Sequence, residues 1–230
     1  KAMREAKVHT TWAAPNAAYE DAVLEFIRYA LDTSRTNLFL DSFSAFQQRV
    51  ASLGAINSLI QVVLKLTVPG VPDFYQGAEL WDFSMVDPDN RRPVDYDVRK
   101  TSLASMEFGS SSVPKLLESW RDGRLKLRLI AETLALRQRE PELFGLGSYE
   151  AIQATGPQAD RVCAFMRTNK GISLVSAVAL YPSRGYKMDS WSNCTLTLPS
   201  EAAPQKWTEL YSGRELTLTN KSFLARDLFA

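Results

Sequence analysis

The richest group of chemically capable side chains lies within residues 71–97, where aromatic, amide, acidic and basic residues follow one another. Sugars are bound by planar polar side chains that hydrogen-bond the hydroxyl groups and by an aromatic ring beneath the C–H face. Trp81 and Phe83 are candidates for the ring. An Asx turn fixed by ion pairs between aspartate and arginine is the alternative interpretation of this loop. The polar candidates are Asp87, Asn90, Arg91 and Arg92.

Acid–base, nucleophilic and metal chemistry find less support in the sequence. Glycoside hydrolysis needs two carboxylic acids about 5–10 Å apart. Glu79 and Asp87 could form such a pair, but their spacing does not distinguish them from solvated loop acids. His9 accompanies no nucleophile motif such as GxSxG. Cys163 and Cys194 with one His cannot supply a zinc tetrad, and the Asp-rich loop lacks the Gly and final Glu of a calcium loop. We therefore expect no metal, no cofactor and two cysteines that pack as small apolar residues.

The composition of the 230-residue chain argues against several classes of partner. The chain has 27 Lys and Arg against 26 Asp and Glu, so its formal net charge of +1 gives no electrostatic basis for binding nucleic acid or anionic lipid. No uncharged apolar run approaches the roughly 18 residues of a membrane span. The longest run, residues 59–68, is interrupted by Gln61 and Lys65. Without a signal peptide pattern, we expect a cytoplasmic protein, and the absence of an initial Met suggests an excised piece of a longer one.

Helical patterns dominate the first two thirds of the chain. Asn16 is the expected N-cap of the first helix, and Pro69 with Gly70 should end the second. Asp122 is the expected N-cap of the third helix, which Pro141 should end. The amphipathic stripes that predict these helices cover residues 19–30, 56–64 and 127–134.

Between the second and third helices, residues 71–76 are typical of a short buried strand, and a long polar loop follows. The order helix, Pro-Gly, strand and loop is that of one step of a β/α barrel, in which loops after the strands line the active site. This order would place Gln76, Glu79 and Trp81 at a catalytic face. A buried strand with a solvated loop is the alternative.

After about Gly145 the apolar pattern changes to a period of two, which predicts short strands separated by turns. The expected strands lie within residues 162–167, 172–180, 194–198, 207–211 and 216–219. We therefore predict an α+β chain, with a helical region over 1–145 and a small antiparallel sheet or sandwich domain over 146–230.

Two runs in the middle of the chain resemble a known enzyme family. PGVPDFYQGAEL (69–80) is similar to a run found across the α-amylase superfamily. ELWDFSMVDPDNRRPVDY (79–96) resembles the maltooligosyl trehalose synthases more specifically. KVHTTWAAPNAAYEDAV (7–23), DGRLKLRLIAETLALRQREPELFGLGSYEAI (122–152) and the β-rich tail agree in order, so the resemblance spans essentially the whole chain.

The resemblance implies an enzyme that converts the reducing-end α-1,4 linkage of a maltooligosaccharide into an α,α-1,1 linkage by intramolecular transglucosylation, with retention at the anomeric carbon. It also implies that all three catalytic carboxylates lie upstream of the last barrel strand. The last of them belongs to a stretch like T-H-D-T-K-R, whereas His9 is followed here by Thr10, Thr11 and Trp12. We therefore expect the C-terminal portion of such an enzyme, with no catalytic residue and no activity alone.

For the fold, the resemblance implies the last strand and helices of a (β/α)8 barrel followed by a small antiparallel β-sandwich domain. The implied partners are a maltooligosaccharide and the missing N-terminal barrel portion, without which apolar surface should stay exposed at residues 56–64 and 71–75. Superfamily relatives place an arginine of this loop near the donor subsites, which would be Arg91 or Arg92. The implied substrate-binding residues are Tyr75, Gln76, Glu79, Trp81, Asp87, Asn90, Arg91 and Arg92.

Two other functions stay open. The chain could be the C-terminal part of another α-amylase superfamily hydrolase or glucanotransferase, although the VDPDNRRPVDY run argues against these. It could also be a non-catalytic glycan-binding module, which would need two or three exposed aromatic side chains in a row. Trp191, Trp207 and Tyr211 are the candidates for that row, and packing in a core explains them equally well.

Overall fold

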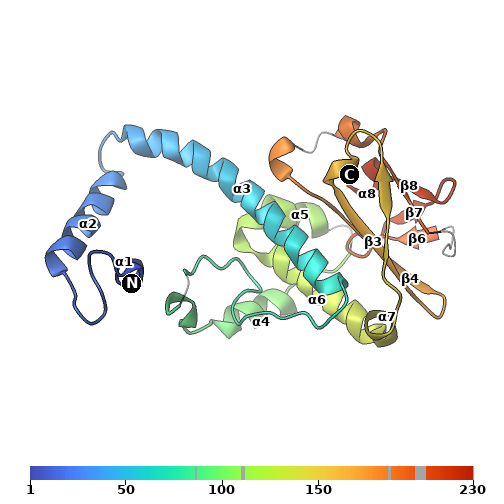
Figure 1. Cartoon of the computed structure of the whole chain (residues 1–230), viewed down its shortest axis with the longest axis horizontal. Helices are drawn as coiled ribbons and strands as arrows, with labels where there is room; N and C mark the ends of the chain where they lie inside the picture. The colour runs from blue at the N-terminus through green and yellow to red at the C-terminus, as the bar shows by residue number, and fades with distance from the viewer. Residues whose placement is uncertain (86, 110–111, 186–187, 200–205, 230) are drawn as a thin grey trace. The chain divides into compact units, whose positions relative to one another are not determined.

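The computed structural model describes residues 1–230 except 86, 110–111, 186–187, 200–205 and 230 (Figure 1). Contacts between Cα atoms divide the chain into two compact units, and each is described by itself. The first unit comprises Lys1–Gly54 and Asp82–Val94, and the second comprises Ala55–Trp81 and Asp95–Ala230. Helix α3 (Leu38–Thr67) contributes its first part to one unit and its last part to the other.

The first unit consists of helices and the loop over residues 82–94. Besides the first part of α3, it contains α1 (Ala2–Ala6), α2 (Ala17–Ala30) and the 3-10 turn η1 (Asp89–Arg91). The helix predicted over residues 19–30 is confirmed as α2. Its predicted N-cap is also confirmed, because the Asn16 side-chain oxygen accepts a hydrogen bond from the Tyr19 amide at 3.1 Å.

Polar contacts hold the first unit together. Among its described residues, the buried side chains are those of Thr10 and Asp89. The Arg4 guanidinium donates two hydrogen bonds to the Glu20 carboxylate, at 2.8 and 2.7 Å. The Thr10 hydroxyl donates to the same carboxylate and accepts from the Asn16 amide at 2.9 Å. Hydrogen bonds from Arg4 and then Thr10 lower the pKa of Glu20 to about 2.

Large apolar side chains of α2 and of the first part of α3 lie exposed. No residue of α2 is buried, and the buried residues of α3 all belong to its last part. Exposed apolar side chains in such number are typical of an interaction surface. We call it the α2–α3 apolar surface; it comprises Leu24, Phe26, Ile27, Tyr29, Leu31, Leu38, Phe39, Phe43, Phe46 and Val50.

Helix α3 starts far earlier than the apolar stripe at residues 56–64 predicts, and it ends at Thr67, just before Pro69 and Gly70 as expected. Its 30 residues include an 18-residue window with a mean hydropathy of 1.5, of which 17% is buried. By length and composition alone it is long and apolar enough to cross a membrane. The core helix of a water-soluble protein passes the same test, so this is weak evidence for a membrane span.

Five further α-helices lie among the described residues of the second unit. The predicted helix over residues 127–134 is confirmed as α6, which ends two residues before Pro141. Its N-cap is Gly123 with φ of 79°, so the prediction of Asp122 is wrong by one residue. The Asp122 carboxylate instead accepts a hydrogen bond from the Arg124 amide at 2.9 Å. The helices are α4 (Tyr96–Ala104), α5 (Val113–Glu118), α6 (Arg124–Arg139), α7 (Pro141–Gly145) and α8 (Ala225–Leu228).

Residues 71–76 form no strand, so that prediction is wrong. A strand needs a neighbour that shares its backbone hydrogen bonds, and none of the described strands pairs with this segment. Val71 is 93% exposed. The start of the segment is held by Arg137, whose guanidinium donates to the carbonyl oxygens of Leu66 at 2.7 Å and Gly70 at 2.8 Å.

All described strands follow Gly145 and pair antiparallel, as predicted, in three small sheets ordered β1-β3-β4, β2-β5-β8 and β6-β7. The long β3–β4 hairpin (Figure 1) closes through Lys170 and Gly171, both with positive φ, as a two-residue turn requires. Strands β1, β2 and β8 were not predicted from the sequence pattern. The strands are β1 (Glu150–Ala151), β2 (Gln153–Thr155), β3 (Val162–Asn169), β4 (Ile172–Ala179), β5 (Thr195–Thr197), β6 (Lys206–Thr208), β7 (Glu215–Thr217) and β8 (Ser222–Leu224).

The main apolar core of the second unit lies among these strands and α8. Trp191, Cys194, Leu196 and Ala225 are its most deeply buried members. Both cysteines are free, and Cys194 packs as the small apolar residue that was expected. The buried Arg167 of β3 ties this core to the helices, because its guanidinium donates to the Phe144 carbonyl at 2.7 Å.

Candidate functional site

The predicted substrate-binding residues fall into two sets that belong to different units, and each set is described by itself. Tyr75, Gln76, Glu79 and Trp81 belong to the second unit. Asp87, Asn90, Arg91 and Arg92 belong to the first unit.

The first set sits on a tight turn. The Ala78 amide donates to the Tyr75 carbonyl at 3.0 Å. Gly77 at the centre is buried and has φ of 91°, a conformation that other residues rarely adopt. Tyr75 is 48% exposed and Gln76 is exposed as well, so both side chains are accessible from solvent.

Arg99 of α4 holds the far side of this turn. Its Nε donates to Glu79 Oε2 at 2.9 Å, and its Nη2 donates to the Gly77 carbonyl at 2.6 Å. The third nitrogen, Nη1, donates to the Asp95 carbonyl at 2.9 Å, at the N-cap of α4. Glu79 is therefore engaged in an ion pair with Arg99, and both side chains are mostly buried.

Trp81 is fixed against the start of α6. Its indole N–H donates to the Trp120 carbonyl at 2.6 Å, and the two rings meet edge to face at 6.3 Å. The Lys126 ammonium donates to the Leu80 carbonyl at 3.3 Å. A Cβ at Gly123 would lie only 2.9 Å from the Trp81 backbone nitrogen, so this approach requires glycine. The contacts leave Trp81 half-buried, with its orientation set by α6.

The second set forms two ion pairs within the loop over residues 82–94. Asp87 accepts from the Arg91 guanidinium at 2.9 Å, and both side chains are exposed. Asp89 pairs with Arg92 and accepts from the Met85 amide at 2.8 Å. These contacts are the aspartate–arginine ion pairs that the sequence offered as the alternative to sugar binding by this loop.

The electrostatics of this loop keep both carboxylates ionised. Hydrogen bonding from Arg91 lowers the pKa of Asp87, and the Met85 amide followed by Arg92 lowers the pKa of Asp89. The Asn90 side-chain oxygen is buried and has no hydrogen-bond partner among the described residues. Phe83 is 90% exposed. The loop thus presents an exposed ring, charged groups and one unused acceptor.

The aromatic row of a glycan-binding module is not formed, so that hypothesis loses its main support. Trp191 is completely buried in the core of the second unit. Trp207 is half-buried and packs edge to face on Phe223 at 5.7 Å. The Tyr211 hydroxyl lies 3.0 Å from the Thr133 hydroxyl, and burial raises the pKa of Tyr211 to about 12.

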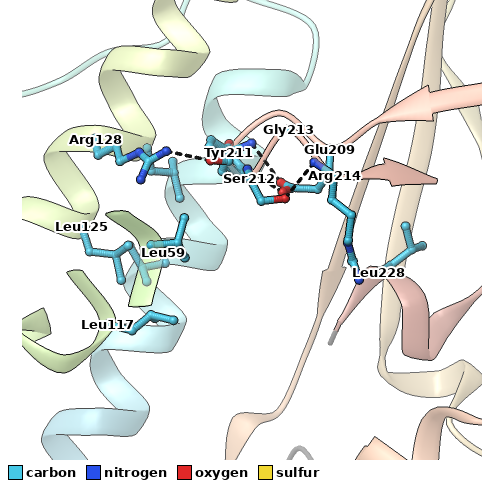
Figure 2. Close-up of a pocket in the computed structure, with 12 residues that line it drawn as sticks. Leu59, Leu117, Leu125, Arg128, Glu209, Tyr211, Ser212, Gly213, Arg214 and Leu228 are labelled. Carbon is cyan, nitrogen blue, oxygen red and sulfur yellow. Dashed lines mark hydrogen bonds between the residues drawn. The ribbon is translucent and has the colours of Figure 1, made fainter. Parts of the chain in front are cut away.

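A cavity of about 760 Å³ in the second unit involves none of the eight predicted substrate-binding residues, although Tyr211 of the predicted aromatic row lines it (Figure 2). Leu59, Leu117 and Leu125 line one side, from α3, α5 and α6. The chain turn that follows β6 lines the other side, where the Glu209 carboxylate accepts from the backbone amides of Tyr211 and Ser212.

Arg128 is the buried charge beside this cavity, and its donors are used within the protein. It donates to the carboxylate of Glu132 at 3.1 Å, to the hydroxyl of Ser112 at 2.7 Å and to the Tyr211 carbonyl at 2.7 Å. These bonds cross-link α6 to a turn 83 residues away in sequence. No sequence pattern signals a contact of that kind, and its engaged donors indicate a structural role.

Comparison with known proteins identifies relatives of this chain by sequence. A protein named as a maltooligosyl trehalose synthase in Mycobacterium tuberculosis, strains CDC 1551 and H37Rv, is 37% identical over 213 residues, or 93% of this chain. This chain matches a portion of maltooligosyl trehalose synthases. The resemblance found in the sequence is therefore confirmed, and no family model matches the chain.

Solved structures of maltooligosyl trehalose synthase match the fold. One crystal structure gives a TM-score of 0.71 at 31% identity over 96% of this chain. The maltooligosyltrehalose synthase of Arthrobacter ramosus gives a TM-score of 0.75 at 26% identity over 99% of this chain. The chain spans about a quarter of these relatives, 24% of the curated sequence and 27% of each solved chain.

Proposed function

We propose that the complete polypeptide carrying this sequence is a maltooligosyl trehalose synthase, an isomerase that moves the reducing-end glucose from an α-1,4 to an α,α-1,1 linkage. The observation that carries the proposal is the 37% identity over 93% of the chain to a protein of that name. Similarity of fold to two solved synthases, at TM-scores of 0.71 and 0.75, supports it independently.

In this proposal the chain supplies the C-terminal end of the catalytic barrel and the β-rich domain after it, divided near residue 145. The three catalytic carboxylates would come from the rest of the polypeptide. This chain alone would then be inactive.

The contribution of this chain to the reaction would be contact with the sugar. Transfer to a glucose hydroxyl instead of water requires that the released glucose stay oriented and that water be kept out. Exposed Tyr75 and Gln76 offer a ring, a hydroxyl and an amide to sugar hydroxyls. The unused Asn90 acceptor also favours a ligand, because buried polar atoms are usually hydrogen-bonded.

The proposed partners are a maltooligosaccharide and the remaining barrel portion of the polypeptide. The α2–α3 apolar surface supports the second partner, since α2 buries none of its residues within the first unit. With a net charge of +1, the chain offers nucleic acid no basic surface. We place the enzyme in the cytoplasm, with the apolar side chains of α3 covered by protein instead of by lipid.

The test is incubation of the complete polypeptide with maltopentaose, followed by chromatography and a reducing-end assay. A synthase removes reducing ends without changing chain length. A rise in reducing ends would indicate a hydrolase, and a ladder of longer and shorter chains would indicate a glucanotransferase; either result would overturn the proposal.

A double variant tests the sugar-contact role of the loop. Replacing Arg91 and Arg92 by Ala should lower the rate about tenfold or more, as expected when charged hydrogen bonds to a substrate are lost. Arg184→Ala is the matched control, because Arg184 forms an equally exposed ion pair with Asp160 at 2.7 Å. A near-native rate in the double variant would remove both arginines from the site.

A further inference from the structure

We propose that Arg99 is a positioning residue for the sugar-contact turn, and that Glu79 serves this turn through Arg99 without touching the sugar. The inference rests on the proposed function, because it assigns roles within that site. Its geometric basis is the arginine fork that joins the Gly77 carbonyl, the Glu79 carboxylate and the start of α4.

The three hydrogen bonds use each nitrogen of the Arg99 guanidinium and lie at 2.6–2.9 Å. A planar guanidinium presents its donors in a fixed relation, so holding one bond aligns the others. The Arg99 and Glu79 side chains are 18% and 27% exposed. Water and salt therefore screen this ion pair less than they would screen a fully exposed pair. A lysine at this position could supply a charge but not the fork.

The turn held by Arg99 carries the accessible side chains of the first predicted set. Gly77 directly follows Tyr75 and Gln76, and the bond from the Ala78 amide to the Tyr75 carbonyl closes the turn. On its other flank, Trp81 is fixed to Trp120. Displacement of the Gly77 carbonyl would therefore move Tyr75 and Gln76, while Trp81 stays anchored.

The same geometry assigns Glu79 a different role from the one predicted. Its Oε2 points at Arg99, so its charge is matched inside the protein. A group that contacts the sugar as a carboxylate would lose function on conversion to the amide. A group that only accepts from Arg99 can be replaced by Gln, which keeps an acceptor oxygen.

The experiment compares four variants of the complete polypeptide by steady-state conversion of maltopentaose. Arg99→Lys and Arg99→Ala should raise KM about fivefold or more, with a smaller change in kcat, because uniform binding contacts are displaced. Glu79→Gln should stay within about twofold of the wild type. Arg137→Ala is the matched control, since Arg137 also donates to two carbonyl oxygens of the neighbouring segment, at Leu66 and Gly70.

Amide hydrogen exchange supplies a readout that does not depend on activity. Loss of the charge-assisted bonds in Arg99→Lys should speed exchange at the Ala78 amide about tenfold, whereas Arg137→Ala should leave that amide unchanged. Unchanged exchange at Ala78 together with an unchanged KM in Arg99→Lys would overturn the inference. So would an equal rise in KM in Arg137→Ala, because the effect would then be general loosening.

Two outcomes separate this inference from the proposed function. An active wild type with native KM in Arg99→Lys would overturn the inference and leave the proposed function standing. A wild type that makes no trehalose linkage would overturn the proposed function and the sugar-contact part of the inference with it. A large loss of kcat in Glu79→Gln would indicate that the Glu79 carboxylate takes part in the reaction, which would contradict the role assigned to it here.

Discussion

The two units of this chain are stabilised in opposite ways. The second unit has an apolar core in which Trp191, Cys194 and Leu196 are completely buried. The first unit buries Thr10 and Asp89 among its described residues, while Phe26, Phe46 and other large apolar side chains remain exposed. Burial of apolar surface is the dominant favourable contribution to folding, so the second unit carries its own stability and the first unit depends on hydrogen bonds and ion pairs.

The difference explains what each unit contributes to the proposed site. The Gly77–Trp81 turn belongs to the unit with a core and is anchored by Arg99 and Lys126 from two helices. The loop with Asp87 and Arg91 belongs to the unit whose described residues form no apolar core, and it relies on exposed ion pairs, which contribute little to stability. We infer that the first unit reaches its working form when its apolar surface is covered.

The largest expected effect comes from deleting the same side chain in each unit. Leu196→Ala removes a completely buried leucine from the core and should lower the free energy of unfolding by about 2–5 kcal/mol. Leu38→Ala removes a leucine that is 80% exposed and should change it by less than about 0.5 kcal/mol. Chemical denaturation of both variants measures the difference.

The comparison between the units would fail if both leucine substitutions lowered the free energy of unfolding by the same amount. An effect above about 1 kcal/mol at Leu38 would mean that the first unit has apolar packing that its exposed side chains do not indicate. Ile172→Ala, at a 44% exposed position of β4, controls for the loss of an exposed apolar side chain within the second unit.

The sequence predicts the helices and strands of the second unit better than the contacts that join them. Alternation was sufficient to predict β3, and a nearly continuous apolar run was sufficient to predict β4, because each strand's own residues carry the pattern. The first part of α3 also carries an apolar stripe at helical spacing, formed by Phe39, Phe43, Phe46 and Val50, which the three predicted stripes leave out. Residues 71–76 have strand composition, but pairing is decided by neighbours that lie elsewhere in the chain.

The candidate site was predictable only as a list of residues. The composition of the loop and the family resemblance pointed to Tyr75, Gln76 and their neighbours. The anchoring by Arg99, 20 residues from Glu79, depends on how α4 lies against the turn, and a single sequence does not contain that information. Ion pairs between Asp87 and Arg91 were visible as an alternative because they join residues four apart.

A second, smaller effect is expected from charging the α2–α3 apolar surface. Phe39 and Phe46 lie on the first part of α3, and Phe39 stacks on Phe43 at 5.2 Å between ring centroids. We expect this chain by itself to self-associate through the α2–α3 apolar surface. Replacing Phe39 and Phe46 by Glu should shift it toward monomer, because like charges and lost apolar area both oppose association. Sedimentation velocity at equal concentration measures the shift.

The control for that experiment is the same double change at apolar positions of the other unit that are also exposed. Leu146 and Ile172 are 78% and 44% exposed, and their replacement by Glu should leave the sedimentation profile unchanged. Equal shifts in both double variants would show that net charge, and not the α2–α3 apolar surface, controls association. In the complete polypeptide, where we propose that the rest of the protein covers this surface, the Phe39 and Phe46 changes should instead destabilise the fold.

The smallest expected effect is the pH dependence of the first unit. Glu20 has a pKa of about 2 in the folded chain against an ordinary value of 4.5, because Arg4 and Thr10 donate to its carboxylate. A carboxyl group with a depressed folded pKa stabilises the fold at pH values above its unfolded pKa, and that stabilisation is lost as the pH falls from 4.5 toward 2. Glu20→Gln should therefore lower the melting temperature of α2, followed by its helical signal, at pH 7. The difference in melting temperature from the wild type should shrink as the pH falls through this window. Asp21→Asn, at the adjacent exposed position, controls for the removal of one carboxylate from α2. A difference in melting temperature between Glu20→Gln and wild type that stays constant down to pH 2 would mean that the amide disturbs packing and not charge. The first unit would then depend less on its ion pairs than the comparison with the second unit requires.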